Sequence, residues 1–428
     1  MTLRTKVISG AKWTTISTAI LALCAILKIS ILTRYLDTED FGLMALVTFV
    51  MGFMNLFNDF GLTVAILHVT KISKKVYSSL YWFNMFVGVV IFVFLWLITP
   101  LISIFYELPI LNTLIPLIGV NLIISGIGKL FNIQERKNLN FKSISVIDVV
   151  GALISLAIAI YLAINGYGVY ALVYSLIGQF LVTNIALFVI GIKKYGLTFH
   201  FKYLEVMPFV RIGLYQVGSQ FVNYFNRDID ILIIGKFFSA DVLGGYSLAR
   251  ELVKRPVSFI SPILNMVGAP TLSKFNADAQ KLKQYYLKMT NMLASLIIPM
   301  YVCIILFAYP IVYILYGPDL TNIVIIVQIL SINMIMRTIG SNIGNLVIAS
   351  GRTDIELRWN LAVLIVTPIF IIFGSLFNVQ MVAIMVSLSS IVLFVPGYYL
   401  LTNKIISLTF REYFNAYFKL NFKQFLRS

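Results

Sequence analysis

Polar and charged side chains recur at helical spacing inside two strongly apolar segments of this 428-residue chain. Both segments lie between Gln216 and Asn265, and a short turn joins them. Residues three and four apart share one face of a helix, so each segment is predicted to be a helix with one polar face. These faces carry Gln216, Ser219, Gln220, Asn223, Asn226, Arg227 and Asp230 in the first segment, and Tyr246, Arg250, Lys254, Ser258, Ser261 and Asn265 in the second.

Such charges are expensive in a bilayer, at no less than about 2.5 kcal/mol each, and they usually face a bundle interior or a watery cavity. We therefore expect the two polar faces to border a shared lumen. At membrane depth the bases Lys28, Arg211, Arg227, Arg250, Lys254, Arg255 and Arg337 outnumber the acids Asp59, Asp228, Asp230 and Glu251. Guanidinium groups bind phosphate bidentately, so this surplus favours an anionic ligand held by Lys28, Arg227, Arg250, Lys254 and Arg337.

The alternative is that these charges neutralise one another and only hold helices together, as Arg227 and Asp230 could do at a spacing of three residues. A coupling ion, H⁺ or Na⁺, could use Asp59, Asp230 or Glu251, but no coordination pattern selects one of them. No cofactor is expected, and two histidines are too few for a histidine-based metal site.

The composition defines the fold class. With 60% hydrophobic and 12% charged residues, the chain is predicted to be an all-α polytopic membrane protein. We expect about twelve transmembrane helices, since each apolar run has roughly 20 residues or more. They form an N-terminal six-helix lobe (1–202) and a C-terminal six-helix lobe (203–403), followed by a basic cytoplasmic amphipathic tail (404–428). The tenth helix is expected over 321–349, where Gly340 and Gly344 form a GxxxG pattern that predicts close helix packing.

The net charge of +16 reflects topology rather than nucleic-acid binding. Most bases fall in alternate loops and in the tail, and loops rich in Lys and Arg face the cytoplasm. Both termini of this multi-pass protein are therefore expected in the cytoplasm. The aromatic and basic tail predicts an interfacial helix on anionic lipids.

No nucleotide-binding loop or hydrolase motif is present, and the short outer loops offer no catalytic set, so the chain is not expected to be an enzyme.

An internal repeat supports two equivalent halves. The run Thr33-Arg34-Tyr35-Leu36, Phe41-Gly42 and Leu46 recurs 202 residues later as Gly235-Lys236-Phe237-Phe238, Leu243-Gly244 and Leu248. Halves with an even number of spans enter from the same side, so the predicted pseudo-two-fold axis runs along the membrane normal. The same offset pairs Lys28 with Asp230, and we expect these two residues to form an ion pair that helps close the outer side.

These motifs resemble a known family. Arg34-Tyr35-Leu36 with Phe41-Gly42, Asp230-Ile231-Leu232-Ile233-Ile234-Gly235, Leu243-Gly244-Gly245-Tyr246-Ser247-Leu248-Ala249 with Pro256, and Pro270-Thr271-Leu272-Ser273-Lys274 stand in the order seen in polysaccharide-unit flippases of the Wzx type. Those flippases belong to the multidrug/oligosaccharidyl-lipid/polysaccharide transporter superfamily. The resemblance covers nearly the whole chain and is strongest to colanic-acid and teichuronic-acid exporters.

The resemblance implies alternating access in the inner (cytoplasmic) membrane and a role in surface polysaccharide synthesis. The cargo would be an undecaprenyl-pyrophosphate-linked glycan, and the polysaccharide polymerase machinery is a further partner to consider. The pyrophosphate would meet the bases, and Gln216, Gln220, Asn223 and Asn226 would meet the sugars. One alternative is a multidrug cation antiporter of the same superfamily, although that would need a net-acidic cavity. A second is a membrane-embedded sugar polymerase or ligase, which would need the missing outer site.

Overall fold

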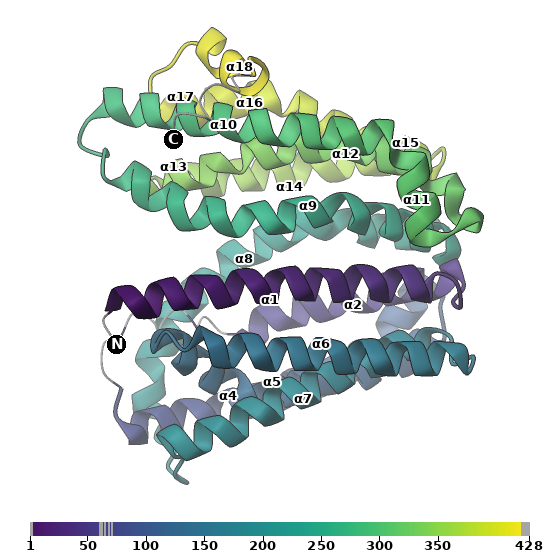
Figure 1. The fold of residues 1–428 in the computed structure, drawn as a ribbon, viewed down its shortest axis with the longest axis vertical. Helices are drawn as coiled ribbons and strands as arrows, with labels where there is room; N and C mark the ends of the chain where they lie inside the picture. Colours follow the sequence, from purple (N-terminus) through teal and green to yellow (C-terminus); the bar gives the residue numbers. More distant parts are fainter. Residues whose placement is uncertain (1–2, 60–62, 64–65, 67–68, 70–71, 421–428) are drawn as a thin grey trace. The chain divides into compact units, whose positions relative to one another are not determined.

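The described part of the chain is mostly α-helical and contains no β-strand (Figure 1). The structure, a computed structural model, describes residues 3–59, 63, 66, 69 and 72–420, except for the side chains of 3–8, 59, 212–216, 219, 259 and 261–267. The long helices are α1 (Leu3–Leu32), α2 (Thr38–Asp59), α4 (Lys74–Tyr106), α5 (Leu111–Lys137), α6 (Phe141–Ile164), α7 (Val169–Tyr195), α8 (Tyr203–Phe237), α9 (Ala240–Ser273) and α10 (Ala279–Leu306). The remaining helices are α11 (Ala308–Tyr316), η1 (Pro318–Ile323), α12 (Val324–Gly340), α13 (Asn342–Ser350), α14 (Thr353–Ser375), α15 (Val379–Val392), α16 (Phe394–Gly397), η2 (Tyr398–Thr402), α17 (Asn403–Ile405) and α18 (Phe410–Phe418).

Ten stretches of the described chain are long and apolar enough to cross a membrane. The polar helices α8 and α9 are not among them, but they have 35 and 34 residues, which exceeds the roughly 20 residues that a crossing needs. Their positions match the predicted seventh and eighth spans. The prediction of an all-α multi-pass membrane fold is confirmed.

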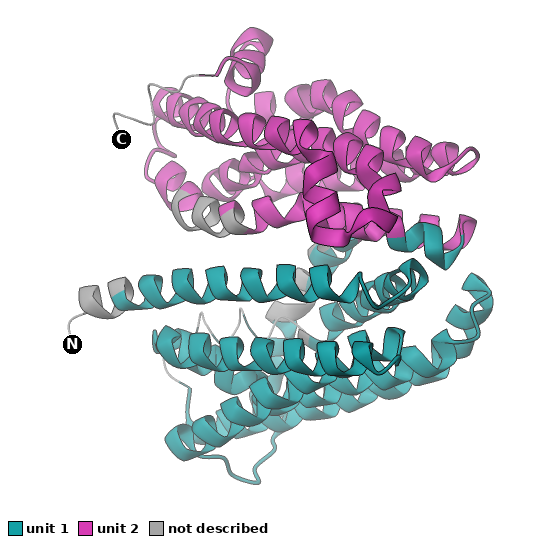
Figure 2. Ribbon diagram, turned by 45° about the vertical axis from the view of Figure 1, so that its right-hand side comes forward, with its two compact units in different colours: residues 1–224, 239–244 teal, residues 225–238, 245–428 magenta. Residues whose placement is uncertain are grey.

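The chain divides into two compact units, coloured separately in Figure 2. Unit 1 contains residues 1–224 and 239–244, and unit 2 contains residues 225–238 and 245–428. Within unit 1, α6 packs on α1 and α7, and α5 packs on α4 and α7. Within unit 2, α12 packs on α10 and α15, and α14 packs on α15. The division falls inside α8, whereas the predicted lobes divide before it, and the lobe boundaries stay a prediction.

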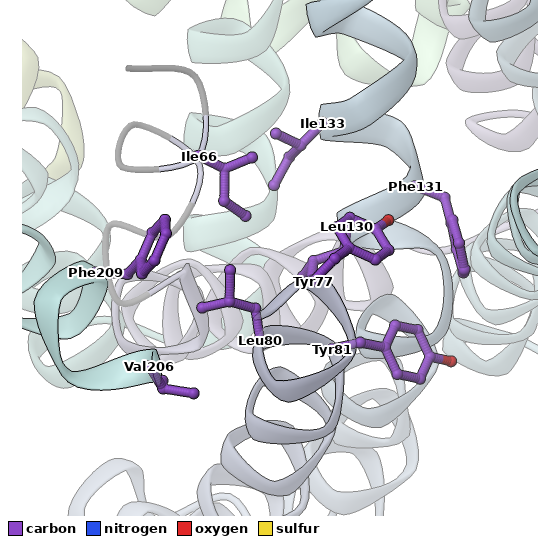
Figure 3. Packing of buried hydrophobic residues seen from close by; sticks show 9 residues of the cluster. All are labelled: Ile66, Tyr77, Leu80, Tyr81, Leu130, Phe131, Ile133, Val206 and Phe209. Atoms are coloured by element: carbon purple, nitrogen blue, oxygen red, sulfur yellow. The ribbon is translucent and has the colours of Figure 1, made fainter. Parts of the chain in front are cut away.

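The first turns of α8 belong to the core of unit 1 (Figure 3). Val206 and Phe209 join the buried cluster that α4 and α5 supply through Leu80, Leu130 and Phe131. Apolar burial contributes roughly 25 cal/mol per Å², so these contacts hold the start of α8 with unit 1. The later turns of α8 lie in unit 2.

A close glycine crossing joins α2 to the first turns of α9 within unit 1. A Cβ atom on Gly42 would lie 1.8 Å from the carbonyl oxygen of Ala240, and one on Gly244 would lie 1.8 Å from that of Thr38. The backbones therefore touch directly, as only glycine permits. Residues 38 and 240 differ by the same 202 positions as 42 and 244, so the contact is reciprocal and places equivalent parts of the sequence repeat together.

The predicted tenth span over 321–349 lies within one apolar stretch, Pro318–Ser350, that is long enough to cross a membrane, but its helix is interrupted at Ser341. The amide of Ser341 bonds to the carbonyls of Arg337 (3.0 Å) and Thr338 (3.2 Å), and α13 starts at the next residue. Asn342 then donates to the Thr290 hydroxyl of α10 over 2.9 Å, and both side chains are buried. This polar contact anchors α13 separately from α12.

The described part of the tail forms a short helix, α18, on unit 2. Thr409 and Glu412 form a capping box at its start. Tyr413 and Tyr417 are buried, each with its ring centroid 4.9 Å from that of Phe394. The outer stripe of Phe410, Phe414 and Phe418 is exposed. Binding of this stripe to anionic lipids stays a prediction.

We expect acid to loosen α18. The Lys283 ammonium, 2.7 Å from Glu412, and the Thr409 amide hold the pKa of Glu412 below its usual value. The ion pair therefore stabilises the docked helix above that usual value, and the stabilisation is lost as the pH falls through the lowered pKa. Glu412→Gln should raise amide hydrogen exchange in α18 by up to about fivefold at neutral pH, the scale of an exposed ion pair. Exchange that does not change in the variant would contradict a role for this pair.

Candidate functional site

The candidate site lies where α8 and α9 turn back on each other. α8 ends at Phe237 and α9 begins at Ala240, and the Val242 amide bonds to the Ser239 hydroxyl (3.4 Å) at the start of α9. Because so short a turn makes the helices antiparallel, residues on α8 and α9 at similar distances from the turn lie side by side. The carboxylates at positions 228 and 230 of α8 are thereby brought beside the polar face of α9, and all of these residues belong to unit 2.

Arg250 is the centre of this cluster. Its guanidinium donates through Nε to Asp230 over 2.7 Å and through one terminal nitrogen to Asp228 over 2.8 Å. The same nitrogen also reaches the backbone carbonyl of Arg227 at 2.5 Å. Arg250 and Asp230 are 9% and 7% exposed, so both ions need these partners to remain charged.

Asp230 is further held by neutral donors. The Tyr246 hydroxyl donates to it over 2.8 Å, and the amide of Ile231 donates to its other oxygen over 3.0 Å. Both carboxylate oxygens of Asp230 are therefore satisfied by donors from α8 and α9. This arrangement locks α8 to α9.

Two more bases share the second carboxylate. Arg227 lies 2.7 Å from Asp228, and Lys254 lies 3.5 Å from it. Asp228 thus faces three cations, which exceeds what one negative charge can balance. The side chain of Arg227 remains 56% exposed.

Arg337 of α12 adds a fourth cation to the cluster. Its charge interacts electrostatically with Arg250, Asp230 and Asp228, but its guanidinium has no hydrogen bond or ion pair with the residues that the structure describes. The side chain is exposed and lies one turn before the break at Ser341. Four bases and two carboxylates leave a formal charge of +2, which suits an anion with several oxygens.

Glu251 lies apart from this arrangement. It pairs with Arg255 over 3.4 Å, one turn further along α9, and is 49% exposed. The pair is locally neutral, so it changes the charge of the cluster little. A coupling role for Glu251 stays a prediction.

The amides predicted to contact sugars divide between the units. Gln220 is half-buried and Asn223 is exposed on the part of α8 that belongs to unit 1. Asn226, in unit 2, donates to the Asn360 carbonyl of α14 over 2.8 Å. The side chains of Gln216 and Asp59 lie outside the described residues.

Lys28 lies in unit 1, where its ammonium donates to the hydroxyls of Ser155 (3.0 Å) and Ser175 (2.7 Å). Asp230 is bonded to Arg250 and Tyr246 in unit 2, so each member of the predicted Lys28–Asp230 pair has partners inside its own unit. The pair stays a prediction.

Sequence reasoning missed Asp228 and Tyr246 as members of the site. The adjacent Arg227 and Asp228 were a usable signal, but helical spacing favoured Arg227 with Asp230. That pairing is corrected by the structure, in which Arg227 bonds to Asp228 and Asp230 bonds to Arg250. The sequence pattern puts Tyr246 on the polar face of α9. Its partner, Asp230, is set by the contact between α8 and α9, which spacing within one helix does not predict.

Long apolar helices and a polar, net-positive cluster define a multi-pass membrane protein of a transporter fold. Solved structures share this fold: the lipid II flippase MurJ in an inward closed conformation aligns with a TM-score of 0.73 at 15% identity, covering 94% of this chain and 89% of that chain. An inward-facing multidrug resistance transporter of the MATE family aligns with a TM-score of 0.70 at 15% identity, covering 90% and 94%.

The chain belongs to the family of polysaccharide biosynthesis proteins, whose pattern matches residues 31–325. It is 29% identical over 421 residues to the teichuronic acid biosynthesis protein TuaB of Bacillus subtilis, covering 97% of this chain and 86% of TuaB. It is 26% identical over 424 residues to the lipopolysaccharide biosynthesis protein WzxC of Escherichia coli, covering 96% and 84%.

Proposed function

We propose that this protein flips undecaprenyl-pyrophosphate-linked oligosaccharides across the cytoplasmic membrane for surface polysaccharide synthesis. The observation that carries the proposal is the surplus positive charge around Arg250, with the Arg227 and Arg337 side chains exposed. A pyrophosphate offers several charged oxygens, which arginines bind bidentately. A cationic drug would be repelled by the same cluster.

The relatives support this class of cargo. TuaB and WzxC are named for the synthesis of teichuronic acid and lipopolysaccharide, and MurJ is named as a flippase of lipid II. A transporter that carries a finished lipid-linked unit forms no bond, so the protein is proposed to act without being an enzyme. The basic loops and tail support cytoplasmic termini and contact with anionic lipids, and a polymerase is a candidate partner on the far side.

Deletion of the gene is expected to cause undecaprenyl-linked repeat units to accumulate in the cell, because they are built but not moved outward. Extracted lipids are analysed by mass spectrometry in the deletion strain and in the same strain expressing the wild-type chain, which should restore the normal level. Normal export in the deletion strain, together with greater sensitivity to a cationic dye, would instead identify a multidrug antiporter.

A further inference from the structure

Lys28 is held in unit 1 in a way that suits a reversible proton site. Its ammonium donates to Ser155 of α6 and Ser175 of α7, whose side chains are 2% and 0% exposed. The Ser175 hydroxyl itself donates a hydrogen bond to the carbonyl of Leu172 over 2.7 Å. The two hydroxyls take the place of hydration water around the ammonium.

None of the described carboxylates forms an ion pair with Lys28. The nearest along α7 is Asp40 of α2, which accepts from the amide of Val169, six residues and about 9 Å before Ser175. Asp148 of α6 is seven residues, about 10 Å, from Ser155. The other charged groups on these elements whose side chains the structure describes are farther along them or exposed: Lys142 on α6, Lys193 and Lys194 on α7, Lys12 on α1 and Glu39 on α2.

Hydroxyl partners accommodate both states of the amine. A hydroxyl accepts a hydrogen bond from the ammonium, and after rotation it donates to the lone pair of the neutral amine. A carboxylate partner would favour the charged form by Coulomb attraction and retain the proton. Asp230, by contrast, is fixed by Arg250 and Tyr246, and Glu251 is paired with Arg255.

From this geometry we propose that Lys28 is the protonation site that couples cargo movement to a proton gradient. The step is the binding of one proton by the neutral amine on one side of the membrane and its release to the other side. Outward movement of the glycan lipid then accompanies inward movement of one proton. The inference rests on the proposed flippase function and names its coupling ion.

The test uses the purified full-length protein in liposomes with an undecaprenyl-pyrophosphate-linked, fluorescent oligosaccharide as probe. For one proton per cargo, a gradient of one pH unit should enrich the probe about tenfold on the proton-rich side at steady state. In Lys28→Met the enrichment should fall to the level without a gradient. Lys12→Met, which removes an exposed lysine from the same helix, is the matched control and should behave as wild type.

Lys28→His keeps the test decisive if Lys28→Met fails to fold. Histidine loses its proton about four pH units below lysine in water, so gradient-driven transport should persist with its pH profile shifted towards acid. Full enrichment in Lys28→Met, or an unshifted profile in Lys28→His, overturns the proposal. Wild-type protein that moves no probe at all refutes the flippase function, whereas wild-type protein that moves it without regard to the gradient refutes only the coupling.

Discussion

Arg337→Ala is expected to reduce export of lipid-linked glycan roughly 10- to 100-fold while leaving thermal stability unchanged. The guanidinium has no bond to a described residue, so its loss leaves no protein group unsatisfied, and the cargo loses a charged hydrogen bond of about 1.5–3 kcal/mol. Accumulated repeat units in a complemented deletion strain report the export, and thermal unfolding of the purified protein reports the stability.

Arg250→Ala provides the contrast. It removes the charged partner of Asp230 and one charged partner of Asp228, and breaking such a buried pair costs about 3–5 kcal/mol. This variant should therefore lose both stability and export. Arg255→Ala, which removes a guanidinium from the separate Glu251 pair, should change either property little. Normal export in Arg337→Ala would show that the anion binds elsewhere.

Sequence alone was sufficient for the fold class, because apolar runs long enough to span a bilayer are stable only when they are buried in its hydrocarbon core. It also placed Arg227, Arg250 and Lys254 on helix faces that do meet. It could not assign the ion pairs, since helical spacing ranks only partners within one helix. In the structure Arg250, from the neighbouring helix, bonds to both carboxylates. Spacing within α8 alone cannot predict that contact.

The glycines show the same limit of pattern reasoning. Gly340 and Gly344 were predicted to pack closely, but a Cβ on Gly344 meets no described atom within 4 Å, and one on Gly340 meets only the Tyr417 hydroxyl at 3.8 Å. A small residue matters only where another backbone approaches it, and that depends on tertiary structure. Gly42 and Gly244 were recognised as repeat positions, yet nothing in the sequence said that they meet.

Gly42→Ala and Gly244→Ala are each expected to destabilise the protein by about 1–3 kcal/mol or more, the scale of overpacking, and to lower export strongly. Each new Cβ would lie 1.8 Å from a carbonyl oxygen of the facing helix, and backbone cannot move aside as a flexible side chain can. Relief therefore requires α2 and the start of α9 to separate. Thermal unfolding and glycan export are the measurements.

The double variant distinguishes a shared crossing from two local clashes. Because the contacts are reciprocal, a separation that accommodates one Cβ also makes room for the other, and the combined cost should be smaller than the sum of the single costs. Gly344→Ala is the matched control, since that glycine lies inside α13 with open space around it; alanine there should be neutral or favour the helix by up to about 1 kcal/mol. Additive losses in the double variant, or wild-type stability in Gly42→Ala, would show that α2 and α9 do not meet through one reciprocal contact.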